Sequence, residues 1–248
     1  MNPLLAVTLQ SMQADMARMD QVAMNLANAH TIGYKRDVLA APPFARLLAA
    51  GEATLTGAQP TRHMDQRSGS LKASGQPLDV ALAGPGWFEV RTDEGLAYTR
   101  QGDFRADAQG RLVTARGHAV LGTSGEIRLP PGVPVIDAEG RIYEGGAAGA
   151  SAVRLRAESV SQIKVVQFDP AAVPVRRGDG LVTFEGMPQP AEGRVELRQG
   201  FLENSNVSSM QEMVQLMQTV RHFESLQKIT LGYDEMLGNA VRKLGETS

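Results

Sequence analysis

The chain has 248 residues, of which 42% are hydrophobic and 21% are charged, and its formal net charge at pH 7 is −2. This balance, without a long run of lysine or arginine, gives no electrostatic support for a nucleic-acid partner. No apolar run approaches the roughly 20 residues of a membrane span, so no membrane insertion is expected. The N-terminus lacks the pattern of a cleaved secretory signal, and the absence of cysteine excludes disulfides and thiolate metal ligands.

A helix is predicted from Pro3 to Asn28. Asn2 can cap its start, and Pro3 suits the first helical position because its missing N–H would be unsatisfied there anyway. Apolar or small residues recur at alternating intervals of four and three, which is the spacing of two helices packed as a coiled coil. These residues are Leu5, Leu9, Met12, Met16, Met19, Ala23 and Leu26.

The same segment is poor in charge. Up to Tyr34, its only acidic or basic residues are Asp15, Arg18 and Asp20. A helix with a solvated back normally carries more glutamate and lysine. We therefore expect several faces of this helix to contact protein, against the simpler alternative of one amphipathic helix on a globular core.

A connector is predicted after this helix. Asn28 and Gly33 suit the helix end, because both tolerate the left-handed backbone conformation. Residues 37–67 are rich in alanine, proline, glycine and threonine. They are expected to be extended or partly ordered, with weak helical character from Phe44 to Ala50.

Alternating hydrophobic residues and turn residues predict a central all-β domain of short strands over residues 68–200. Asp93-Glu94-Gly95 is expected to connect two strands as a hairpin. The related segments Asp107–Gly110 and Asp137–Gly140 are expected to form two turns of the same chemistry, since two copies are too few for a solenoid. Strands are expected at Leu78–Leu82, Trp87–Thr92, Leu96–Arg100, Asp103–Ala106, Arg111–Thr114, Arg141–Tyr143, Val153–Leu155, Gln162–Phe168, Leu181–Phe184 and Arg194–Leu197.

A second helix is predicted from Ser209 to Leu244. Ser209 and Glu212 have the spacing of a capping box, and Gly232 and Gly238 are weak points. Nine of the eleven methionines lie at the two ends of the chain, where their flexible side chains suit an adaptable interface. The apolar positions of this helix are Met213, Met217, Val220, Phe223, Leu226, Ile229, Tyr233, Met236 and Leu244.

These elements predict an α+β chain in which N- and C-terminal α-helices form a coiled-coil-like layer and carry a central all-β domain. The expected organisation is a terminal helical domain of residues 1–36 and 201–248, a connector of residues 37–67 and a β domain of residues 68–200.

Motifs for catalysis or cofactor binding are not found in the sequence. The four histidines, at positions 30, 63, 118 and 222, have no partner at metal-ligand spacing, and surface or capping roles are expected for them. Asp103 and Asp107 do not fit a calcium-binding loop. The chain has no nucleophile elbow, phosphate-binding loop or zinc-protease helix. We expect no enzymatic activity, no cofactor and no metal.

Three groups of residues resemble the flagellar rod and hook proteins of the bacterial axial family. They are Asn25–Asn28 with Thr31–Arg36, Leu78–Phe88 with Tyr98–Thr114, and Gly200–Val207, which leads into a methionine-rich helix. The chain departs from the family pattern at Met24, where a second asparagine is usual, and at Trp87, where phenylalanine is commoner. The resemblance covers essentially the whole chain, in order.

The resemblance implies a structural subunit of the flagellar rod in the basal body, stacked helically with its terminal helices in an inner tube. The implied partners are other rod proteins, copies of itself and the flagellar type III apparatus, which would export the chain without a cleaved signal. One β domain and a modest length fit the rod proteins better than the longer hook protein. The short connector after Lys35 fits the proximal rod better than the distal rod.

We expect assembly to be carried by residues of both helices, through head-to-tail association that propagates as a helix instead of closing into a ring. Apolar residues of the first helix are expected to pack against those of the second within one subunit, while the charge-poor faces meet neighbours. The expected interface residues are Leu5, Leu9, Met12, Met16, Met19, Asn25, Leu26, Asn28, Met213, Met217, Val220, Phe223 and Leu226.

The alternative from another class is a monomeric β-domain enzyme or carbohydrate-binding protein that carries a helical hairpin. It would need a concave site with convergent polar or aromatic groups. The aromatic content of 5% argues against sugar stacking.

Overall fold

The computed structural model describes residues 3–40, 61–145, 159–169, 172–191 and 195–245. The chain divides into two compact units. The helical unit comprises residues 1–27, 37–63 and 208–248, and the β unit comprises residues 28–36 and 64–207. The chain therefore passes between the two units four times.

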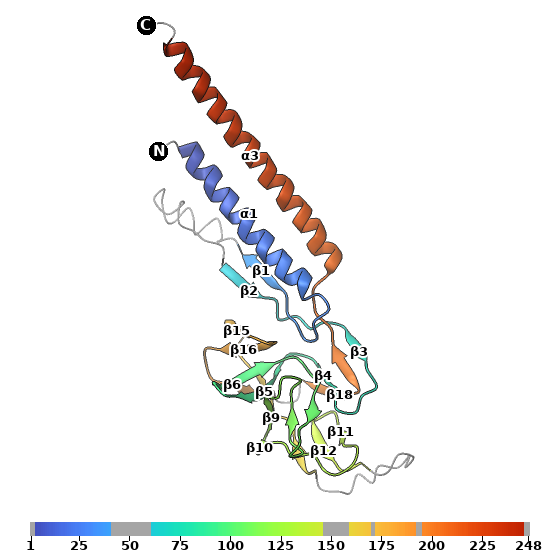
Figure 1. Ribbon diagram of the computed structural model, residues 1–248. Coiled ribbons are helices and arrows are strands. Elements are labelled where there is room, and N and C mark those ends of the chain that lie inside the picture. The colour runs from blue at the N-terminus through green and yellow to red at the C-terminus, as the bar shows by residue number, and fades with distance from the viewer. Residues whose placement is uncertain (1–2, 41–60, 146–158, 170–171, 192–194, 246–248) are drawn as a thin grey trace. The chain divides into compact units, whose positions relative to one another are not determined.

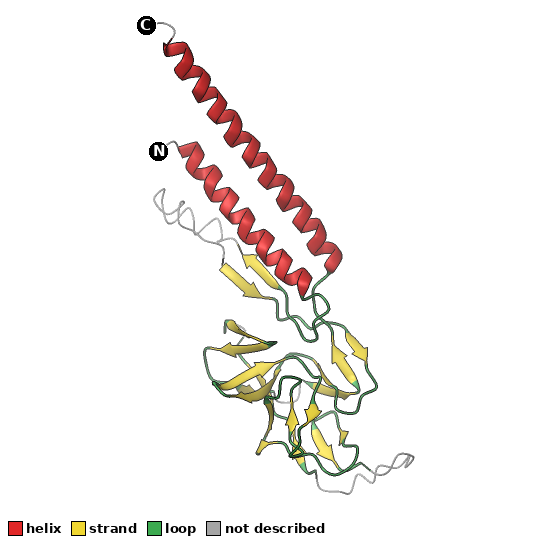
Figure 2. Cartoon of the chain, in the orientation of Figure 1, coloured by secondary structure: helices red, strands yellow, loops and turns green. Residues whose placement is uncertain are grey.

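Two long helices lie side by side and antiparallel in the helical unit (Figures 1 and 2). Helix α1 covers Pro3–Ala27, and helix α3 covers Ser209–Gly245 and continues through Gly232 and Gly238. The two helices predicted from the sequence are thus confirmed, each to within one residue at its ends. Two short strands, β1 (Asp37–Ala40) and β2 (Thr61–Met64), pair with each other.

The β unit consists of short antiparallel strands (Figure 2). Its largest sheet has the order β15-β16-β6-β5-β9-β8-β7, with β10, β14 and β17 paired to its members, and β11-β12-β13, β18-β4 and β19-β3 form smaller sheets. The strands are β3 (Leu71–Ala73), β4 (Val80–Ala83), β5 (Trp87–Thr92), β6 (Gly95–Thr99), β7 (Arg105–Ala106), β8 (Leu112–Val113), β9 (Ala119–Gly122), β10 (Gly125–Glu126), β11 (Val135–Ile136), β12 (Arg141–Tyr143), β13 (Ser161–Gln162), β14 (Val165–Gln167), β15 (Pro174–Gly178), β16 (Leu181–Phe184), β17 (Gln189–Pro190), β18 (Glu196–Gln199) and β19 (Phe201–Glu203).

The core of the β unit lies where these strands turn alternate side chains inward. Phe88, Val90 and Val120 are completely buried in it, and the Phe88 and Phe104 rings meet edge to face with centroids 5.1 Å apart. A smaller cluster surrounds Trp87. The central all-β region predicted from the sequence therefore has a packed interior of its own.

The two related turns use one set of hydrogen bonds. The Asp107 carboxylate accepts hydrogen bonds from the backbone N–H groups of Gln109 and Arg111, at 2.9 and 2.7 Å. The Asp137 carboxylate accepts the equivalent bonds from Glu139 and Arg141, at 3.1 and 2.7 Å. The glycine at the fourth position of each turn has a positive φ, 74° and 80°. The prediction of a shared turn chemistry is confirmed.

Other segments differ from their prediction or cannot be compared with it. The described ends of the connector form β1 and β2, so these residues have regular hydrogen-bonded structure. Residues 28–36 lie in the β unit, although the sequence groups them with the first helix. Phe44–Ala50 and Val153–Leu155 lie outside the described residues.

Candidate functional site: a buried ionic cluster and an exposed helix surface

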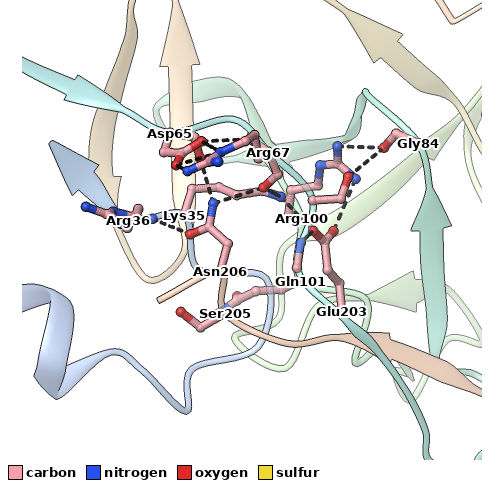
Figure 3. Close-up of polar contacts among 12 residues, drawn as sticks. Lys35, Arg36, Asp65, Arg67, Gly84, Arg100, Gln101, Glu203, Ser205 and Asn206 are labelled. Carbon is pink, nitrogen blue, oxygen red and sulfur yellow. Dashed lines mark hydrogen bonds and ion pairs between the residues drawn. The ribbon is translucent and has the colours of Figure 1, made fainter. Parts of the chain in front are cut away.

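Residues from all three motif groups meet at a buried carboxylate in the β unit (Figure 3). Lys35 Nζ donates a hydrogen bond to Glu203 Oε1 at 2.6 Å, and Arg100 Nη1 donates one to Glu203 Oε2 at 3.1 Å. The three side chains are only 1–2% exposed. We call Lys35, Arg100 and Glu203 the ionic cluster. It joins the segment after α1, the end of β6 and strand β19.

Backbone groups satisfy further hydrogen bonds of the cluster. Lys35 Nζ also donates to the carbonyl of Arg67 at 2.9 Å, and Arg100 Nη2 donates to the carbonyl of Gly84 at 2.8 Å. The N–H of Gly69 donates to Glu203 Oε1 at 2.7 Å. Such bonds offset part of the free energy needed to take charges out of water.

Two cations share one carboxylate in this cluster, and the pKa of each cation is lowered. Burial lowers the pKa of Lys35, the nearby Arg100 guanidinium lowers it further, and Glu203 opposes both effects. Burial also lowers the pKa of Arg100, against the attraction of Glu203. The cluster is therefore held by Glu203, without which two desolvated positive charges would face each other.

Asn206 fixes the last part of the C-terminal motif to the N-terminal motif. Its Oδ1 accepts a hydrogen bond from the backbone N–H of Arg36 at 2.7 Å. Its Nδ2 donates to the carbonyls of Asp65 and Arg67, both at 2.9 Å (Figure 3). The Arg67 side chain in turn lowers the pKa of the Asp65 carboxyl by hydrogen bonding to it. Lys35 of the N-terminal motif and Asn206 of the C-terminal motif thus both bind to the segment Asp65–Arg67.

Gly33 lets the N-terminal motif lie directly on the chain at Arg100. Its φ is 65°, and a Cβ at this position would lie 2.6 Å from the carbonyl carbon of Arg100. The N–H of Gly33 donates to the carbonyl of Glu203 at 2.8 Å. A side chain here would separate backbone segments that the ionic cluster holds together.

Replacing Gly33 with alanine should therefore destabilise the β unit by about 3–5 kcal/mol, the upper range for a single substitution. Gly75 is the matched control, because its φ is 71° and a Cβ there would meet nothing within 4 Å. Gly75→Ala should cost only about 1–2 kcal/mol, from the left-handed backbone alone. Urea unfolding of both variants measures the difference, and equal losses would show that the close approach is unimportant.

The helical unit has a different chemistry, because its two helices meet through buried polar side chains. Asp15 Oδ2 lies 2.5 Å from His222 Nδ1, and Asn25 Nδ2 donates to Glu212 Oε2 at 3.2 Å. Asn25 also exchanges two hydrogen bonds with the backbone of Asp37, each of 2.9 Å. Asp15, Asn25 and Glu212 are at most 2% exposed. Polar contacts of this kind specify one register between two helices.

Five of the apolar residues predicted to pack α1 against α3 are exposed in the single subunit, and their part in the interface stays a prediction. Leu9, Met16, Met213, Met217 and Val220 are 57%, 54%, 50%, 54% and 37% exposed. The 4–3 spacing identifies a stripe that includes Met16, but Asp15, one position away, is the residue that contacts His222 of α3. Leu5, Met12, Met19, Leu26, Phe223 and Leu226 are half-buried.

We call the exposed apolar residues of both helices the outer face. They are Val7, Leu9, Met16, Met24, Met210, Met213, Val214, Met217, Val220, Ile229, Leu231 and Met236. These twelve large apolar side chains, exposed among the described helix residues, are the candidates for an interaction surface.

The two asparagines included in the predicted interface have structural partners within the chain. Asn25 is completely buried by the bonds described above. Asn28 is half-buried and lies in the turn after α1, where its side chain accepts a hydrogen bond from the Thr31 hydroxyl at 3.1 Å. Their part in assembly stays a prediction.

The structure also gives partners to residues for which the sequence predicts other roles. His222 is 58% exposed, as expected for a surface position, and it also contacts the buried Asp15. Lys35, Arg100 and Glu203 come together across more than 160 residues of chain. The available signal was that each of the three motifs contains at least one charged residue within two positions of an aromatic or apolar residue.

No group of three or more histidine or acidic residues suited to a metal ion occurs among the residues that the structure describes. Over the same residues, neither helix is long and apolar enough to cross a membrane.

Comparison with known proteins gives matches along nearly the whole chain. Residues 81–144 match the family described as the flagellar hook protein FlgE/F/G D1 domain, and residues 198–243 match the flagellar basal body rod FlgEFG protein C-terminal family. The flagellar basal-body rod protein FlgF of Mesorhizobium japonicum is 30% identical, over 98% of each chain. FlgF of Caulobacter vibrioides is 32% identical over 92% of each chain. FlgG of Bacillus subtilis is 29% identical, over 94% of this chain and 96% of its own.

Proposed function

Because the chain belongs to the family of flagellar basal-body rod proteins, we propose that it assembles into the rod through its terminal helices and transmits motor torque. Rod proteins of this family are structural, so the chain is a structural protein and not an enzyme. This membership sets aside the alternative of a monomeric enzyme or carbohydrate-binding protein. The proposed partners are copies of the chain and other rod proteins.

The outer face is the observation that supports assembly through the helices. Its residues lie on both α1 and α3, and α1 carries only three charged residues. Burying an exposed methionine or leucine side chain stabilises an interface by about 1.5–3 kcal/mol. The polar contacts between α1 and α3 hold the two helices in one register, which leaves the outer face for neighbouring subunits.

The ionic cluster supports the second part of the proposal, the transmission of force. Residues 28–36 follow α1, and residues 201–207 precede α3. Both segments are bound to the cluster and to Asn206. A load on either helix would therefore reach the β unit through buried, charge-assisted hydrogen bonds, which are about twice as strong as neutral ones.

Within the family we propose that the chain is an FlgF-like subunit, placed in the proximal part of the rod. Relatives that are at least 30% identical include several FlgF proteins, whereas the FlgG of Bacillus subtilis is 29% identical. We also propose export through the flagellar type III apparatus without cleavage of the N-terminus. Mass spectrometry of the assembled and the cytoplasmic protein should then find the same N-terminal residue.

The experiment that tests the function is purification of intact hook–basal bodies from cells that produce the protein. We expect the chain to copurify with the rod, and labelling by immunogold should place it between the membrane-proximal end and the hook. Hook–basal bodies that are complete without the chain would refute a rod subunit.

The isolated subunit should exchange its amide protons rapidly at both ends and slowly between about Leu78 and Leu197. The reason is that the terminal helices expose much of their apolar surface before neighbours cover it, whereas the β unit has its own core. Hydrogen exchange followed by mass spectrometry measures this directly. Uniform protection would mean that the helical unit is already stable without neighbours.

A further inference from the structure

A groove in the helical unit has the features of a docking site. It has a volume of about 750 Å³ and lies between α3, α1 and the end of β1. Leu39, Met210 and Val214 give it apolar surface, and Arg18 and His222 are the charged or titratable side chains among its described lining residues. Asp15 lies beneath both side chains, with its carboxylate 3.7 Å from the Arg18 guanidinium and 2.5 Å from the His222 ring. The Arg18 side chain is nevertheless 46% exposed and has donors left for a partner.

At the opposite end of the helical unit, α3 extends beyond the start of α1, and we call this extension the overhang. Asn25 contacts Glu212, and ten residues away on each helix Asp15 contacts His222, so the antiparallel register is the same at both places. Continued to the start of α1 at Pro3, this register reaches residue 234 of α3. Residues 235–245 therefore extend beyond α1 by about 16 Å, at about 1.5 Å per residue. Figure 1 shows α3 continuing past the N-terminal end of α1.

The chemistry of α3 around the start of the overhang, at residues 231–236, complements the groove. Between residues 229 and 241 the only charged residues are Asp234 and Glu235. They are flanked by Leu231 and Met236, each of which is 64% exposed. An acidic pair between apolar side chains matches a groove that combines apolar surface with the Arg18 guanidinium and the hydrogen-bonding His222 ring.

We propose that the groove of one subunit receives residues 231–236 of α3 from a second copy of the chain. Val214 and Met236 are 22 residues apart on one continuous helix, about 33 Å, so the same subunit cannot make this contact. The groove and residues 231–236 lie toward opposite ends of the helical unit. The contact is therefore heterologous and can repeat from copy to copy. This inference rests on the proposed function and names the surfaces that would perform it.

Cysteine cross-linking tests the contact, because the natural chain has no cysteine. A chain with both Val214→Cys and Met236→Cys should form disulfide-linked dimers and higher multiples when hook–basal bodies are oxidised. The yield should exceed that of either single variant at least tenfold. The matched control combines Val214→Cys with Met187→Cys, which replaces a methionine of the β unit that is 89% exposed; this pair should give no multiples.

Each outcome decides a different question. Hook–basal bodies that contain the double variant but give no cross-linked multiples would overturn the groove contact and leave the rod function standing. Dimers from Val214→Cys alone would also overturn it, because they indicate a symmetric contact. Absence of the wild-type chain from hook–basal bodies would instead overturn the proposed function. As a further check, Glu235→Lys should lower the cross-linking yield at least fivefold, and Arg18→Glu in the same chain should restore it.

Discussion

Replacing Glu203 with alanine should lower the free energy of unfolding of the β unit by about 3–5 kcal/mol, the range for removing one partner of a buried ion pair. The substitution leaves Lys35 and Arg100 buried without their carboxylate, and it removes the acceptor of the Gly69 N–H. Urea unfolding followed by tryptophan fluorescence measures the loss, because Trp87 is the only tryptophan and is buried in the β unit.

Two comparisons separate this effect from a general loss of a glutamate. Glu196→Ala, at an exposed position of β18, should change stability by no more than about 0.5 kcal/mol. A triple variant with Lys35→Met, Arg100→Met and Glu203→Leu should recover most of the lost stability, because apolar residues of similar size can replace a buried ionic group. If Glu203→Ala were as mild as Glu196→Ala, the cluster would not hold the β unit together.

The local structure of this chain could be predicted from its sequence because it depends on neighbouring residues. The start of α3 at Ser209 agrees with the predicted helix start, although the Glu212 carboxylate contacts Asn25 of α1. The two turns at Asp107 and Asp137 follow from a carboxylate that binds backbone N–H groups two and four residues on. The ends of both helices and the two hairpin turns at Asp107 and Asp137 therefore agree with the prediction.

The ionic cluster could not be predicted in the same way. Lys35 and Glu203 are 168 residues apart, and nothing in the local pattern of either states that they meet. The resemblance to rod proteins marked all three segments as motifs, but it gave no reason for Lys35, Arg100 or Glu203 in particular. Their common burial explains why each motif carries a charge beside aromatic or apolar residues.

The packing of the helices shows a second limit of sequence patterns. A 4–3 spacing identifies a stripe along a helix, but it does not state which protein surface covers that stripe. In α1 the stripe alternates between exposed residues, such as Leu9 and Met16, and half-buried ones, while Asp15 contacts α3. Asp15 and Asn25, two polar residues inside a charge-poor helix, were the available signal for this inner contact.

Replacing Met16 with aspartate should leave the isolated chain folded but stop its incorporation into the rod. The Met16 side chain is 54% exposed in the single subunit, so a charge there stays in contact with water and should change stability by no more than about 0.5 kcal/mol. In an assembled rod the same charge would be buried against a neighbour, at a cost of several kcal/mol.

Met187→Asp is the matched control for this substitution, since Met187 is 89% exposed on the β unit and outside the outer face. Cells with Met187→Asp should swim normally, whereas cells with Met16→Asp should produce the protein, fail to build it into hook–basal bodies and lose motility. Motility in soft agar and the protein content of purified hook–basal bodies distinguish the two. Normal motility with Met16→Asp would mean that the α1 part of the outer face is not covered by neighbouring subunits, and assembly would then have to depend on other surfaces, such as the methionines of α3.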